Sequence, residues 1–139
     1  MLSTRLLHPE ILAALGGAGH GSRVLIADGN YPFSTGSSAG AKKVFLNLRP
    51  GMVAVPDVLE ALVAVLPVES AQVMVPPEGP EPAIFAEFRR LLPRVPMEKK
   101  GRLDFYNEAR SSDTALVIAT GEQRIFANIL LVIGVVPPS

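Results

Sequence analysis

Three short runs of uninterrupted apolar residues constrain the fold of this chain more than any other feature. They lie within residues 23–28, 115–119 and 128–133, and none shows the apolar–polar alternation of a strand with one face in water. Strands that are apolar on both faces are typical of mostly parallel sheets that helices cover on each side. The runs therefore predict a sheet buried between two other layers.

Segments with helical signals separate these runs. Pro9 predicts the start of a short first helix, and Gly16 and Gly17 predict its end. Apolar residues recur with helical spacing over 56–66 and 82–92, and a brief helix is expected over 103–110. Each apolar run can thus have a helix close to it in the chain.

Further strands are expected at 44–48, 70–75 and 94–97. Pro96 interrupts the last of these, which predicts an edge strand because proline cannot donate a backbone hydrogen bond. No segment repeats at a fixed period. The sequence therefore predicts one α/β domain over residues 1–139, a three-layer α/β/α arrangement with a mainly parallel sheet.

Composition excludes several classes of function. The 13 Lys and Arg residues balance the 13 Asp and Glu residues, so no net field attracts nucleic acid or an anionic membrane surface. The chain has no Cys and two His, which argues against a disulfide scaffold, a thiolate nucleophile and a metal site. No apolar stretch approaches the ~20 residues of a membrane span, and no secretory leader is recognisable. We expect a cytoplasmic protein.

Polar residues gather next to the first apolar run. His20 lies between two glycines just before it, and histidine is the side chain that titrates near neutral pH. Two interpretations of His20 are about equally well supported: a catalytic imidazole, and a residue of an ordinary surface turn. The glycines precede the strand, whereas those of a dinucleotide fingerprint follow it, so NAD binding is disfavoured.

Loops that follow strands are the first places to search for a ligand site in an α/β sheet. Asp28 begins such a loop, although Asp, Gly, Asn and Pro also form turns for backbone reasons alone. The irregular stretch 29–43 is long enough to be either functional or disordered. Residues 120–122 follow the strand expected at 115–119. An ordinary hairpin connection to the last strand would also explain their composition. Asn128 opens that last run and needs hydrogen-bond partners if it is buried.

Four segments together resemble the D-ribose pyranase / L-fucose mutarotase family, and the match spans the whole chain. Their order and spacing carry the resemblance, and they are Gly19-His20-Gly21, Ala27-Asp28-x-x-x-Pro32, Thr120-Gly121-Glu122 and Ala127-Asn128-Ile129-Leu130-Leu131-x-x-Gly134-Val135. The stretch Arg102-Leu103-x-Phe105-Tyr106 looks closer to the fucose branch.

The resemblance implies an isomerase that interconverts cyclic forms of free monosaccharides without a metal or organic cofactor. A base takes the proton of the anomeric hydroxyl, an acid protonates the ring oxygen, and the opened sugar recloses. Such acid–base assistance supplies typically ~10²–10⁴-fold. The resemblance also implies an α/β subunit in a ring-shaped homo-oligomer, commonly a decamer, with sugar sites near the subunit boundaries.

The resemblance assigns roles to individual residues. His20 matches the catalytic histidine, and Asp28 matches a partner that orients His20 or binds a sugar hydroxyl. Asn128 matches a sugar-binding amide, and Arg102 matches an arginine of the fucose branch. We therefore expect His20 and Asp28 to be catalytic and Arg102 and Asn128 to bind substrate.

One position departs from the family pattern. The family usually has tyrosine two residues before the asparagine, and this chain has Phe126, which can stack on a sugar but cannot exchange a proton. We hypothesise that Tyr31 supplies the missing hydroxyl. The resemblance thus implies a mutarotase for a fucose-like hexose ahead of ribose. A catalytically weak sugar-binding or transport-associated module is the alternative.

Overall fold

The structure is a computed structural model that describes all of residues 1–139. Its helices are α1 (Pro9–Gly16), α2 (Val55–Val63), α3 (Ile84–Leu91) and α4 (Arg102–Ala109). Its strands are β1 (Arg23–Ala27), β2 (Lys42–Phe45), β3 (Val68–Met74), β4 (Met97–Lys100), β5 (Thr114–Ala119) and β6 (Ile129–Ile133). No helix has both the length and the apolar character that crossing a membrane requires.

The six strands form one sheet in the order β2-β5-β1-β6-β3-β4. Parallel pairing joins β2 to β5, β5 to β1, and β3 to β4. β6 is antiparallel to both of its neighbours, β1 and β3. The sheet is therefore mixed: five strands run in one direction, as expected for a mainly parallel sheet, and β6 runs against them.

The connection from β5 to β6 differs from the hairpin that the sequence left open. A hairpin would pair these two strands, but β1 lies between them. The segment 120–128 contains no helix and returns the chain at the end of the sheet where β5 stopped, so β6 has to run in the opposite direction. The hairpin interpretation was wrong, and residues 120–128 cross the end of β1.

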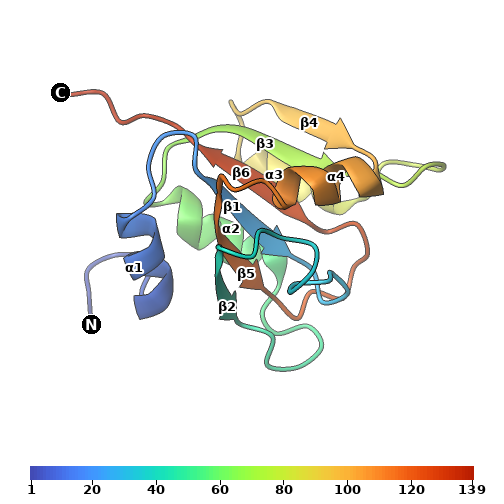
Figure 1. The fold of residues 1–139 in the computed structure, drawn as a ribbon, viewed down its shortest axis with the longest axis horizontal. Coiled ribbons are helices and arrows are strands. Elements are labelled where there is room, and N and C mark those ends of the chain that lie inside the picture. The colour runs from blue at the N-terminus through green and yellow to red at the C-terminus, as the bar shows by residue number, and fades with distance from the viewer.

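The two faces of the sheet are covered by different elements. Val24 and Ile26 of β1 pack in a large core with α1, α2 and α3, whereas Leu25 and Ala27 face a smaller core with α4. Figure 1 shows α4 in front of the sheet and α2 and α3 behind it. Val24, Leu25 and Ile26 are fully buried, which confirms that this strand is covered on both sides.

The long stretch after β1 packs over the smaller core. Tyr31 and Ala41 are buried there together with Phe105 and Ala109 of α4. Rings of Tyr31 and Phe105 meet edge to face, with centroids 6.1 Å apart. This stretch therefore covers part of the second face of the sheet, in a place that a helix would otherwise occupy.

Element boundaries differ from expectation mainly at the sheet edges. The interrupted strand expected at 94–97 is β4, which begins at Met97 and does lie at an edge. Pro96 stands just outside the strand, where its carbonyl accepts a hydrogen bond from Ala71 N at 3.0 Å. At the opposite edge, β2 begins at Lys42 and ends at Phe45, earlier than the expected 44–48.

Candidate functional site

The reversed direction of β6 creates the site. Its amino end lies beside the carboxyl end of β1, because Ile129 pairs with Ile26 in the antiparallel register. Residues just before β6 therefore meet residues just after β1. In this way Asn128 comes next to Asp28, although 100 positions separate them in the chain.

The side chains of Asp28 and Asn128 each accept a hydrogen bond from the backbone near the other residue. Asp28 N donates to Asn128 Oδ1 at 2.7 Å, and Ala127 N donates to Asp28 Oδ2 at 3.1 Å. Asn30 N donates to the other Asp28 oxygen at 3.0 Å. These bonds fix both side chains, and the Asn128 amide N–H groups remain able to donate to a ligand. Burial raises the pKa of the Asp28 carboxyl, and the bonds from Ala127 and Asn30 oppose this effect only in part.

A cleft of about 210 Å³ opens above this pair. We call it the sugar cleft, after the ligand that the family resemblance implies. Five residues that the sequence singled out line it: Asp28, Tyr31, Arg102, Phe126 and Asn128. The remaining lining residues are Asn30, Met74, Tyr106 and Ile125. The cleft thus combines a buried carboxylate, amides, a guanidinium and phenols with an apolar wall, a mixture suited to a small polar ligand with C–H faces.

The two tyrosines in the sugar cleft differ in how their hydroxyls are used. Tyr31 is 4% exposed, and its hydroxyl donates to the Gly36 carbonyl at 2.5 Å, which closes its own loop. Burial also raises the Tyr31 pKa well above its usual range. Tyr106 is partly exposed, and its hydroxyl makes no hydrogen bond within the chain. Geometry therefore favours Tyr106, more than Tyr31, as a phenol that meets a ligand.

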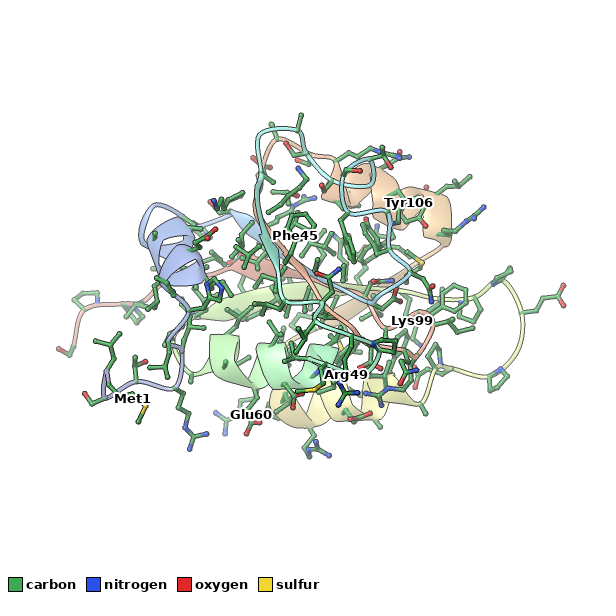
Figure 2. The ribbon with its side chains drawn as sticks, turned by 90° about the horizontal axis from the view of Figure 1, so that it is seen from below. Met1, Phe45, Arg49, Glu60, Lys99 and Tyr106 are labelled. Carbon is green, nitrogen blue, oxygen red and sulfur yellow. The ribbon has the colours of Figure 1, made fainter.

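Tyr106 is held in place through its ring. The rings of Tyr31 and Tyr106 pack edge to face with centroids 5.3 Å apart, and the Arg110 guanidinium lies 5.7 Å from the Tyr106 centroid. Figure 2 shows Tyr106 on α4, where the helix faces the loop after β1. Arg102 stands one helical turn earlier on α4 and is exposed, with no ion pair in the chain.

Phe126 occupies a constrained position at the rim. Its φ of 54° makes it the one non-glycine residue with left-handed backbone geometry, which is uncommon for a bulky side chain. Neighbouring side chains fix the chain on either side of it: Asp28 holds Ala127 N, and Glu122 accepts from Arg124 N at 3.1 Å. Anchoring at both ends sustains the conformation that places the Phe126 ring in the cleft.

The buried Glu122 side chain holds this segment in place through its hydrogen bonds, and sequence analysis did not assign it a role. The carboxylate accepts from Arg124 Nε at 2.9 Å and from Val55 N, at the start of α2, at 3.2 Å. Arg124 also pairs with Glu87 of α3. Burial opposes ionisation of Glu122, but the bonds and charge of Arg124 outweigh it and lower the pKa of the carboxyl.

His20 lies at the other end of β1, away from the sugar cleft. The five residues of β1 separate it from Asp28, a distance of roughly 16 Å at ~3.3 Å per strand residue. His20 is exposed, and its Nε2 lies 3.2 Å from Glu69 Oε2 at the start of β3. Within one chain, therefore, Asp28 does not orient His20.

Sequence reasoning gave no role to Tyr106 and Met74 of the sugar cleft or to Glu69 beside His20. Tyr106 follows Arg102 by four positions, a spacing that places both on one helix face and was available in the sequence. Met74 and Glu69 carried no such signal, because only the sheet order brings β3 beside β6. The structure groups no three His, Asp or Glu side chains in positions suited to a metal ion.

Comparison with known proteins identifies relatives over nearly the whole chain. The sequence model of the RbsD / FucU transport protein family matches residues 1–136. The chain is 32% identical to the fucose mutarotase of Bos taurus, with 96% of this chain and 92% of that protein covered. It is also 32% identical to the D-ribose pyranase of Symbiobacterium thermophilum, with 97% and 98% covered.

Solved structures share the fold over nearly the whole length. The fucose mutarotase from Streptococcus pneumoniae, solved in complex with L-fucose, superposes with a TM-score of 0.84 at 26% identity, covering 99% of this chain and 100% of the other. Bacillus subtilis RbsD, solved with D-ribose, superposes with a TM-score of 0.82 at 24% identity, with 99% and 100% covered. By sequence and by fold, this chain belongs to the RbsD / FucU family.

Proposed function

We propose that this protein is a mutarotase that interconverts the ring forms of a free monosaccharide, a fucose-like hexose ahead of ribose, without a cofactor. One observation carries the proposal: the Asp28–Asn128 pair lies at the base of a cleft that gathers five of the predicted site residues. Fucose mutarotases and D-ribose pyranases among the relatives act in this class of reaction.

The cleft suits a sugar held by its hydroxyls. Asp28 accepts hydrogen bonds from sugar hydroxyls, the Asn128 amide donates one, and Arg102 approaches from the rim. Met74 and Phe126 give an apolar surface for the C–H face of the ring. Fixing the hydroxyls in this way orients the anomeric carbon for proton transfer.

Mutarotation requires one group that removes the anomeric proton and one that protonates the ring oxygen. In the proposal His20 carries the first proton, and the Tyr106 phenol is the best-placed donor within the cleft itself. The ring opens to the aldehyde, the bond to the anomeric carbon rotates, and the ring closes on the other face. No net proton or electron is gained or lost, so no further reactant is needed.

His20 reaches the reaction only if another copy of the chain supplies it. Because β1 separates it from the cleft of its own chain, the proposal includes a homo-oligomer in which His20 and Glu69 of one copy face the cleft of the next. The family resemblance suggests a ring-shaped decamer in the cytoplasm. Sedimentation equilibrium tests this part, and a monomer at micromolar concentration contradicts it.

Exchange NMR of anomer interconversion tests the activity. L-fucose, D-ribose, D-galactose and L-rhamnose are compared for the wild type, His20→Ala and Asn128→Ala, with Arg90→Gln on α3 as an exposed control. We expect acceleration for one sugar that both site variants abolish and the control retains. Acceleration that persists in His20→Ala overturns the role of His20.

A sugar-binding module without catalysis is the second candidate. Phe126 favours it, because that side chain offers no proton where relatives usually have a phenol. Sugar binding detected by ligand NMR, together with uncatalysed exchange for every sugar, establishes this candidate. A 10-fold or greater acceleration for any sugar rejects it.

A further inference from the structure

A second cleft lies beside the sugar cleft at the same end of the sheet. Its volume is about 420 Å³, and apart from two glycines and Pro50 its lining side chains are all polar: Asn30, Asn47, Arg49, Thr120, Glu122 and Gln123. Asn30 lines both clefts. We call this second space the polar cleft, and none of the roles given above uses it.

The walls of the polar cleft are preformed. Backbone hydrogen bonds tie its three loops together: Gly51 N donates to Gly121 O at 2.7 Å, and Gly29 N donates to Glu122 O at 2.9 Å. Gly121 is packed so closely that a Cβ atom there would lie 2.5 Å from Met52 O. A cleft built on such contacts keeps its shape before a ligand arrives.

The charges that face the polar cleft do not balance. Its only acid, Glu122, is already matched by Arg124 and by the Val55 N–H. Its only base, Arg49, has no ion pair, and its single hydrogen bond is a long contact of 3.5 Å with Pro50 O. Figure 2 shows Arg49 in the loop that follows β2. The cleft thus offers one unmatched guanidinium among amide groups, which is a setting for an oxyanion.

We propose that the polar cleft binds an oxyanion and takes the phosphate of a monosaccharide phosphorylated away from its anomeric carbon. Because Asn30 lines both clefts, they adjoin each other, and in the proposal a single ligand places its ring against Asp28 and Asn128 and its phosphate against Arg49. The anomeric hydroxyl stays free, as mutarotation requires. This extension to phosphorylated sugars rests on the function proposed above, whereas the oxyanion site does not.

Inorganic phosphate tests the oxyanion site without any sugar. The full chain is titrated with phosphate at constant ionic strength, and backbone amide shifts are followed by NMR for the wild type, Arg49→Gln and Arg90→Gln. We expect saturable shifts centred on Asn47, Gly51 and Gln123 that vanish in Arg49→Gln and persist in Arg90→Gln. Shifts that are scattered over the surface, or that survive in Arg49→Gln, overturn the site.

A matched pair of sugars tests whether the phosphate arrives on the substrate. D-ribose 5-phosphate should bind roughly 10-fold more tightly than D-ribose, as one charge-assisted contact allows, and the ratio should fall to about one in Arg49→Gln. Equal affinities in the wild type reject a phosphorylated substrate, even if free phosphate binds. Absence of anomer exchange with every sugar, beside intact phosphate shifts, rejects the mutarotase and leaves the oxyanion site standing.

Discussion

Tyr31 and Tyr106 line the same cleft, yet their hydroxyls have different surroundings. The hydroxyl of Tyr31 is buried and donates to Gly36 O, whereas that of Tyr106 is free of hydrogen bonds within the chain. A phenol serves as a proton donor only if its hydroxyl reaches the substrate. The geometry therefore does not favour the hypothesis that Tyr31 replaces the missing phenol at Phe126. It favours Tyr106 as the proton donor instead.

Replacing each tyrosine by phenylalanine separates these roles. Tyr31→Phe should cost about 1 kcal/mol of unfolding free energy, the usual net value of one hydrogen bond, and leave anomer exchange nearly unchanged. Tyr106→Phe should leave stability unchanged and slow exchange about 10-fold or more. Urea denaturation and exchange NMR measure the two effects. A large loss of exchange in Tyr31→Phe would restore the original hypothesis.

The buried Asp28 carboxylate predicts a pH dependence of stability. Because burial raises its pKa in the folded state above the ordinary 3.8, the folded chain holds this proton more tightly than the unfolded chain does. The contribution is complete below the unfolded value and is lost as pH rises through the folded pKa. Relative to Asp28→Asn, the wild type should therefore lose unfolding free energy as pH rises above about 3.8. A flat difference between pH 3 and 7 in urea titrations contradicts this.

At the scale of elements, the segment between β5 and β6 connects the site to the helices behind the sheet. Glu122 reaches the first turn of α2, and Arg124 reaches α3. The same segment carries Phe126 into the sugar cleft and Gln123 into the polar cleft. Its conformation therefore couples both clefts to the packing of two helices.

Replacing Glu122 with glutamine tests this coupling. The pKa of Glu122 is lowered in the folded state, so its contribution to stability is present above the unfolded value of about 4.5 and is lost as pH falls. Glu122→Gln should cost about 2 kcal/mol near neutral pH and progressively less below pH 4.5. Thermal unfolding across pH measures it, with the exposed Glu60→Gln as the control. Equal losses at pH 3 and 7 would contradict the ionic role.

The elements themselves were largely predictable, but their neighbours in the sheet were not. Four helices and six strands follow from periodicity and from proline and glycine positions, because these signals are local. The direction of β6 depends on its pairing with β1 and β3, to which no local residue is specific. For that reason the sequence analysis singled out Asp28 and Asn128 individually. It could not predict the hydrogen bond between them, which depends on the order of the strands in the sheet.

At the scale of the whole molecule, the proposed catalytic groups occupy opposite ends of the same strand. Asp28 follows β1 and His20 precedes it, so in the proposed oligomer one chain contributes to two different sites. The family resemblance places sugar sites near subunit boundaries, and this separation agrees with that expectation. The sequence already placed His20 before the first predicted strand and Asp28 after it, although the family resemblance paired the two residues; the structure shows the full five-residue strand between them.

Mixing two inactive variants tests whether sites are shared between copies. If His20 and Asn128 of one site come from different copies, co-refolded His20→Ala and Asn128→Ala chains should regain roughly a quarter of wild-type exchange, the random share of intact sites. Each variant alone should be inactive. A mixture that remains inactive, although mass spectrometry shows mixed assemblies, places both groups in one chain.

The central position of β6 also determines the order in which the sheet can be completed. β2, β5 and β1 form one group and β3 and β4 another, and only β6 joins them. Because β6 is the last of the six strands in the chain, the two groups exist as half-sheets, each with an unpaired apolar edge, until it inserts. The interval before β6 inserts is therefore when the chain most needs protection from aggregation.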